Sequence, residues 1–236
     1  MDELELSQDE INTLLQRISG ATEEVFNFAT QARAVRGHMP TLDLIYERFI
    51  QFLRIDLFEL LGRTPEITIT PVRHIKYTDL LHDLEVLANV NLIKIKPLSG
   101  TAMIIMDANL VYLLVDKLFG GNGKLQTRIE SREFSAIEQR IIQKTLNIIF
   151  DALVKAWELL YSVYFEYVRS EMNPQFANIA SPNEIVVTAS FRIDIGNMGG
   201  DFHICLPYSM LEPISDLLCH GLQKESTTDK KKTGHI

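Results

Sequence analysis

The chain repeats one order of predicted elements, and this repeat limits its fold more than any other feature. Residues 41–119 show a long helical stripe of apolar residues, strands and a closing helix, and residues 134–219 show the same order again. Two such units bury their apolar faces best as one continuous sheet with helices on both sides. We therefore predict an α/β fold: a pseudo-twofold symmetric α/β/α domain over residues 39–221, with a long helix opening each half.

The first half gives a clear series of elements. Apolar residues recur at helical spacing after Pro40, with Thr41 as the predicted N-cap and Gly62 as the end of the helix. Alternation over residues 67–70 predicts a strand that Pro71 cuts. The elements expected next are a shorter helix over 77–87, an alternating strand over 92–96, a central strand apolar on both faces over 103–106, and a closing helix over 108–119.

The second half follows the same pattern. An apolar stripe over residues 134–160 predicts the second long helix, and Val163 to Tyr167 alternate as a strand. Residues 173–180 stand where the first half has its shorter helix. The remaining predicted elements are a strand over 185–193, a hairpin turn at 196–200, a strand over 202–206 that matches the central strand of the first half, and a closing helix over 208–219.

A glycine-rich stretch, Phe119 to Lys124, joins the two halves. Its three glycines, Gly120, Gly121 and Gly123, predict a turn that projects from the fold and lets another surface come close to the backbone. Phosphate-binding loops open a helix, whereas this stretch closes one, so its context disfavours a phosphate site. The local chemistry alone favours a helix C-cap, with Gly120 ending the helix, followed by a linker. The helical pattern that it closes is Leu110, Leu113, Leu114, Lys117 and Leu118.

Residues 1–18 are an amphipathic segment ahead of the domain, in which residues 7–18 encode a short helix. Ser7 and Glu10 have capping-box spacing, and one helical face carries Ile11, Leu14, Leu15 and Ile18. Because so short a helix is marginal in water, we expect it to fold against a surface. That surface is either the chain's own domain or another protein, and amphipathicity does not separate the two. Residues 19–38 are predicted to be a linker and 222–236 a disordered charged tail, so flexible segments flank the domain.

Composition and motifs exclude several classes of function. The net charge of −8 argues against nucleic acid as a partner. No apolar run reaches the roughly 18 residues of a membrane span, so we expect no direct membrane insertion. The two cysteines and six histidines have no metal-binding spacing, and no nucleophile motif is present. We therefore expect no cofactor, metal or catalytic residues, although a hydrolase site assembled from distant positions stays open.

Three motifs, in register with one another, resemble a known family. Leu6 to Leu15, Arg36 to Leu42, and Gly120 to Gly123 look like the bacterial flagellar motor switch protein FliM, and the resemblance covers the N-terminal segment and the whole repeated domain. It implies a place in the cytoplasmic ring of the flagellar basal body, at the cytoplasmic face of the inner membrane. There neighbouring copies pack side by side and control the direction of rotation in chemotaxis.

The resemblance also implies two binding sites. The N-terminal segment would bind phosphorylated CheY, which makes another protein the partner of the short helix. The glycine-rich stretch falls on the family's GGxG loop, which contacts the middle domain of FliG, so the loop would be a contact and not merely a cap. The CheY-binding residues implied are Leu6, Ser7, Gln8, Asp9, Glu10, Ile11, Leu14 and Leu15, and the FliG-binding residues are Gly120, Gly121, Asn122 and Gly123.

Two departures from the family's pattern matter. The family continues into a C-terminal domain similar to FliN, whereas this chain stops in a charged tail, which puts FliN binding in doubt. The same fold group, CheC, CheX and the FliM middle domain, includes CheC-type phosphatases with a Glu-x-x-Asn pair on each long helix. Here Glu47 precedes Ile50 and Glu138 precedes Ile141, and isoleucine cannot orient a water. We therefore predict a non-enzyme in which Glu47 and Glu138 are solvated helix residues; the alternatives are a CheC-type CheY phosphatase or a CheY-binding decoy.

Overall fold

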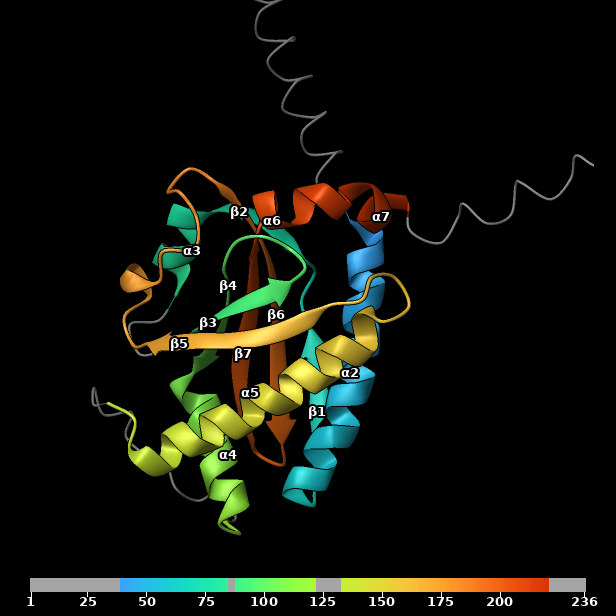
Figure 1. Ribbon diagram of the computed structural model, residues 1–236. Helices are drawn as coiled ribbons and strands as arrows, with labels where there is room; N and C mark the ends of the chain where they lie inside the picture. Colours follow the sequence, from blue (N-terminus) through green and yellow to red (C-terminus); the bar gives the residue numbers. More distant parts are fainter. Residues whose placement is uncertain (1–38, 85–87, 122–132, 221–236) are drawn as a thin grey trace, which may run out of the picture. The chain divides into compact units, whose positions relative to one another are not determined.

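A seven-stranded sheet, antiparallel throughout, forms the centre of the computed structural model, which describes residues 39–84, 88–121 and 133–220 (Figure 1). The strands are β1 Glu66–Ile69, β2 Arg73–Lys76, β3 Ala88–Lys96, β4 Ala102–Asp107, β5 Tyr164–Glu171, β6 Ile185–Ile195 and β7 Met198–Pro207. Their order is β1-β6-β7-β4-β3-β5, and β2 pairs with β6 beside β1.

Two 22-residue helices open the two halves, as the repeat predicts. Both contribute to the main core on one face of the sheet, and α5 passes in front of the sheet in Figure 1 with α2 beside it. The helices are α2 Pro40–Leu61, α3 Tyr77–Asp83, α4 Ala108–Leu118, α5 Ala136–Trp157, α6 Tyr208–Leu211 and α7 Ser215–His220, and the 3-10 turns are η1 Pro174–Phe176 and η2 Glu212–Ile214.

The two halves are related by pseudo-twofold symmetry and exchange their edge strands. The central strands β4 and β7 pair with each other, one from each half. The first strands of the first half, β1 and β2, pair with β6 of the second half, and β5 of the second half pairs with β3 of the first. The predicted symmetry is confirmed, and each half completes the sheet of the other.

Apolar side chains cover both faces of the sheet, and the core on one face is larger than the core on the other. The main core packs α2, α4, α5 and the final helices against one face, and the smaller core packs α3 against the other. In β4, Ile104 and Met106 belong to the main core while Met103 and Ile105 belong to the smaller one. This confirms the prediction of a central strand that is apolar on both faces, within an α/β/α arrangement.

Proline accounts for two errors in the predicted helices. Thr41 is not the cap of the first long helix: α2 begins at Pro40, Met39 is the N-cap, and Thr41 is buried in the first turn. Proline is favoured at the first helical position because its ring fixes φ and its missing N–H costs nothing there. The closing helix of the second half is also broken into α6, η2 and α7, because Pro213 cannot donate the hydrogen bond that a continuous helix needs.

Short elements account for further differences. The hairpin turn predicted at 196–200 consists only of Gly196 and Asn197, because β7 already begins at Met198. The shorter helix ends at Asp83, not 87, and in the second half a single 3-10 turn, η1, takes its place. Strand β2 was not predicted, and β3 begins at Ala88, four residues before the alternation that predicted it. That extension contains Asn89 and Asn91, which are buried but polar and therefore hide the strand pattern.

Candidate functional site

The glycine loop leaves the C-terminal end of α4 through a closed hydrogen-bond pattern. Gly120 has φ +77°, its amide donates to the Lys117 carbonyl at 3.1 Å, and the Gly121 amide donates to the Asp116 carbonyl at 2.7 Å. These two bonds with one left-handed residue form a Schellman motif, which confirms that Gly120 ends the helix. Asn122 and Gly123 lie outside the described residues, and so do Leu6 to Leu15 of the predicted CheY-binding segment.

Phe119, the residue before the glycines, has an exposed aromatic side chain and is not among the predicted contact residues. Its side chain is 71% exposed, whereas Leu113 and Leu114 on the same helix are fully buried. Large aromatic side chains are enriched at protein interfaces, where they often serve as anchors. The signal in the sequence was a phenylalanine directly before the helix-ending glycine.

Two buried charges lie directly beneath the loop. The Lys117 ammonium and the Asp116 carboxylate form an ion pair at 3.1 Å, and each side chain is 5% exposed. A Cβ atom on Gly121 would lie 1.9 Å from Asp116 Oδ1, so the carboxylate occupies the space that a side chain would need. Gly121 is therefore required by close packing, whereas Gly120 is required by its φ angle.

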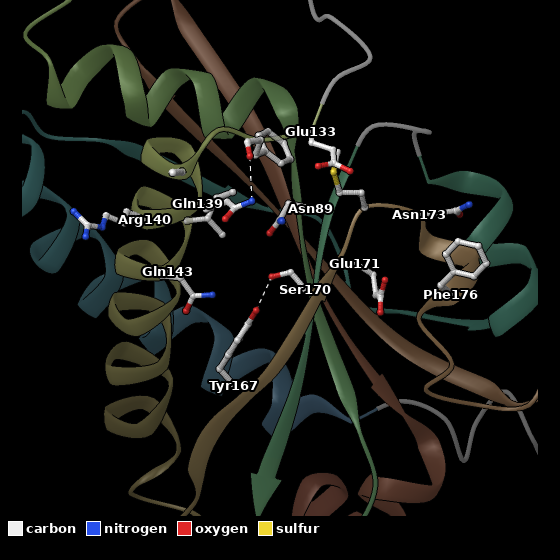
Figure 2. Close-up of a pocket in the computed structure, with 14 residues that line it drawn as sticks. Asn89, Glu133, Gln139, Arg140, Gln143, Tyr167, Ser170, Glu171, Asn173 and Phe176 are labelled. Carbon is white, nitrogen blue, oxygen red and sulfur yellow. Dashed lines mark hydrogen bonds between the residues drawn. The ribbon is translucent and has the colours of Figure 1, made fainter.

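A groove of about 780 Å³ lies between the N-terminal half of α5 and strands β3 and β5 (Figure 2). A chain of hydrogen bonds runs along it. Ser170 Oγ donates to Asn91 Oδ1 at 2.8 Å, and Asn91 Nδ2 donates to Asn89 Oδ1 at 2.5 Å. Because the Ser170 hydroxyl has only one proton, the Tyr167 hydroxyl must donate to Ser170 Oγ, at 2.8 Å.

The groove is lined by amides and hydroxyls, together with the carboxylates of Glu133 and Glu171 and the guanidinium of Arg140. The Gln139 side chain, on α5, already donates to the Phe134 carbonyl at 3.1 Å. Figure 2 shows Tyr167 and Ser170 turned toward each other, while Arg140 extends away from them. The Tyr167, Ser170 and Gln139 side chains are engaged in hydrogen bonds with other protein groups and are not arranged as a nucleophile with its base, so the groove is suited to binding polar groups.

The two glutamates at the phosphatase-motif positions have different surroundings. Glu47 is exposed, as predicted. The prediction that Glu138 is solvated is wrong, because its side chain is 6% exposed and its Oε2 accepts from the Ser135 amide at 2.6 Å. Ser135 Oγ accepts from the Glu138 amide in return, which completes a capping box at the start of α5. Ile50 and Ile141 belong to the main core, so neither long helix presents a Glu-x-x-Asn pair.

Burial, not a catalytic partner, is the main cause of the raised or lowered pKa values of Cys205, His203 and Tyr46. Burial raises the pKa of the Cys205 thiol to about 12 and lowers the pKa of His203, whose Nδ1 lies 2.8 Å from Ser190 Oγ. Burial also raises the pKa of the Tyr46 hydroxyl. In the part of the chain that the structure describes, no three His, Cys, Asp or Glu side chains are grouped as a metal site requires. Within the same residues no helix has the length and apolar character needed to cross a bilayer.

Comparison with known proteins gives a consistent result. The profile of the family described as flagellar motor switch protein FliM matches residues 35–222. FliM of Pseudomonas aeruginosa is 43% identical over 231 residues, which cover 93% of this chain and 71% of the relative. The FliM middle domain of Vibrio alginolyticus is 44% identical, with a TM-score of 0.69 over 75% of this chain and 99% of that chain.

A more distant structure shares the fold. A chain in the crystal structure of a FliG–FliM complex from Helicobacter pylori is 23% identical, with a TM-score of 0.70 over 75% of this chain and 96% of that chain. At that identity the likeness concerns the fold alone. The family profile and the 43% identical relative each cover most of the sequence, and they decide the assignment. The chain belongs to the flagellar motor switch protein FliM family, whose members are non-catalytic switch proteins of the flagellar motor.

Proposed function

We propose that this chain is a switch and scaffold subunit of the flagellar rotor that binds the middle domain of FliG through the loop Gly120–Gly123. The observation that carries the proposal is the end of α4, where a Schellman motif projects bare glycine backbone next to the exposed ring of Phe119. A protruding backbone with one aromatic anchor suits a groove on a partner. The crystallised FliG–FliM complex from Helicobacter pylori, whose fold this chain shares, supports FliG as that partner.

The other functions are inferred from membership of the family. We infer that residues 6–15 bind phosphorylated CheY and that neighbouring copies of the domain pack side by side in the ring, at the cytoplasmic face of the inner membrane. The switch needs only that CheY binds one ring state more tightly than the other, a coupling of typically about 1–3 kcal/mol per site.

Calorimetric titration with the FliG middle domain tests the loop. The wild-type chain is expected to bind, and the double variant Gly121→Asp with Gly123→Asp is expected to lose binding. A Cβ at 121 would lie 1.9 Å from Asp116 Oδ1, and the new carboxylate would add a like charge beside a buried one.

The matched control is Gly62→Asp at the C-terminal end of α2. Gly62 is also left-handed, with φ +64°, and a Cβ there would meet nothing within 4 Å. This control should bind FliG as the wild type does. No binding by the wild-type chain, or undiminished binding by the loop variant, would remove the loop from the FliG contact.

The CheY site is tested by changing the apolar stripe of the N-terminal segment. The double variant Ile11→Ala with Leu15→Ala should weaken binding of phosphorylated CheY, because both side chains are expected anchors. The melting temperature of the domain should not move. The control, Thr13→Ala with Gln16→Ala, changes the opposite helical face and should bind normally. A lower melting temperature would instead indicate that the segment docks on its own domain.

A further inference from the structure

We infer that the buried Asp116–Lys117 ion pair is a positioning device, which fixes Gly120 and Gly121, at the start of the glycine loop, in the conformation that the partner recognises. The inference rests on the proposed function and extends it from the loop to two residues that a partner hardly reaches, since each side chain is 5% exposed. Neither residue was among the predicted site residues.

The pair contacts the loop from two directions. Asp116 and Lys117 are neighbours on α4, and adjacent helical side chains normally point about 100° apart. Here Lys117 Nζ reaches both Asp116 Oδ2, at 3.1 Å, and the Gly121 carbonyl, at 3.5 Å. The Asp116 carboxylate fills the space beside the Gly121 Cα, where a Cβ would lie 1.9 Å from Oδ1. The loop backbone is therefore held through its carbonyl and through the position of its Cα.

Stability alone gives a poor account of these two charges. Burying a charged pair costs desolvation energy, and apolar replacements of similar volume are often neutral or stabilising. The carboxylate also lies in the last turn of a helix, where the helix dipole disfavours a negative charge, so Lys117 must offset it. A fixed loop explains the pair better, because a backbone already in its bound conformation loses less entropy on binding.

The experiment separates positioning from mere support of the fold. The single variants Lys117→Met and Asp116→Asn each leave one charge without its ion-pair partner, whereas the double variant removes both charges and keeps the volume nearly the same. Melting temperature, affinity for the FliG middle domain, and hydrogen exchange of the Gly120 and Gly121 amides in the unbound chain are measured for each variant.

We expect the double variant to regain most of the melting temperature that the single variants lose, but not the affinity. Its affinity for FliG should be at least about tenfold below that of the wild type, and its two loop amides should exchange faster. A residue with a purely structural role would regain affinity together with stability. The pair is therefore only a structural feature if the double variant binds FliG as tightly as the wild type and its amide exchange is unchanged.

An ion pair of the same length, but more exposed to solvent, provides the control. Lys155 Nζ and Asp56 Oδ2 are also 3.1 Å apart, but they join α5 to α2. The double variant Asp56→Asn with Lys155→Met should leave both the affinity and the exchange of the loop amides at wild-type values. An equal loss of affinity in this control would overturn the inference, because any lost ion pair would then produce the effect.

A second route does not depend on removing a charge. Gly121→Ala places a methyl group where the Asp116 carboxylate lies, so the pair must move away from the loop. It should weaken FliG binding about as much as the double variant does, and wild-type affinity in a folded Gly121→Ala chain would overturn the inference even if the double variant fails to fold. If the wild-type chain does not bind FliG, the proposed function fails, while amide exchange still decides whether the pair fixes the loop.

Discussion

Cys205 lies on the central strand β7 with its thiol in the smaller core, fully buried. Burial disfavours the thiolate and raises the pKa of the thiol to about 12. A thiol in this state is a poor nucleophile, so the cysteine packs and does not react. His203 on the same strand follows the same rule with opposite sign, since burial disfavours its charged form and lowers its pKa.

The Cys205 thiol predicts how stability changes in alkaline solution. The unfolded chain releases this proton near the ordinary thiol pKa, about 8.5 to 9, whereas the folded chain keeps it until about pH 12. Above about pH 9 the unfolded state therefore binds fewer protons, and the free energy of unfolding falls as pH rises, by up to about 1.4 kcal/mol per pH unit from this group. Urea unfolding at about pH 8 and about pH 10.5 measures the fall.

Cys205→Ala should show a smaller fall over the same pH interval, even though the smaller side chain lowers its stability at every pH. Burial also raises the pKa values of Tyr46 and Tyr77, and Cys205 is a smaller cause of both shifts, so its loss reduces the tyrosine contribution and acts in the same direction as the loss of the thiol. Cys219→Ala, at a half-buried position on α7, is the control and should behave as the wild type. Equal falls in the wild type and Cys205→Ala would show that the thiol is not the source.

At the scale of single residues, the sequence predicts the roles that depend only on neighbouring residues along the chain. The role of Gly120 could be predicted, because a glycine directly after the end of an apolar helical stripe commonly ends the helix. Ser135 to Glu138 has the spacing of a capping box, which indicates a role for Glu138, but the apolar stripe begins one residue earlier, at Phe134, and hides this helix start. The burial of Asp116 and Lys117 could not, because no local pattern in the sequence shows that the Gly121 backbone lies against the Asp116 carboxylate.

Among the elements, long periodic helices were predicted well and short or interrupted ones poorly. The apolar stripe of α2 is buried as expected, since seven or more residues at one period outweigh local exceptions. Strand β2 has only four residues and no fully buried side chain, so no alternation marks it. In β3, Asn89 and Asn91 replace apolar residues and obscure the strand start.

The capping box of α5 can be tested as an element. Glu138→Ala removes the carboxylate that accepts from the Ser135 amide at 2.6 Å, leaving that amide without its partner at the start of a 22-residue helix. Loss of such a cap typically costs about 1 kcal/mol, so the melting temperature should fall by a few degrees.

Glu47→Ala is the matched control on the other long helix, because Glu47 is exposed on α2. It should leave the free energy of unfolding within about 0.5 kcal/mol of the wild-type value, so the melting temperature should hardly change. Neither variant should change the rate at which phosphorylated CheY decays, since neither helix presents a water-orienting pair. The phosphatase interpretation would be restored if the wild-type chain accelerates the decay of phosphorylated CheY and either variant loses that acceleration.

For the whole molecule, the repeat predicted the symmetry but not the exchange of edge strands. Nothing local in the sequence tells which half β5 joins, because strand pairing depends on contacts that are distant along the chain. The observed pairing of Tyr164–Glu171 with β3, and of β1 and β2 with β6, makes each half incomplete without the other. The halves are therefore repeats in pattern but not independent folding units.

This exchange predicts that the halves fold only together. Residues 39–121 alone would lack β6 for pairing with β1 and β2, and would leave β3 and β4 without β5 and β7 beside them. This fragment and the fragment of residues 133–220 should each give the circular dichroism of a largely unfolded chain. An equimolar mixture of the two should regain structure. The control is the intact domain cut once between residues 121 and 133, which should stay folded, because no strand pairing of the described sheet involves that segment. Independent folding of either fragment would mean that each sheet half is stable without the exchanged strand, and the loop between them would then join two domains and not two parts of one.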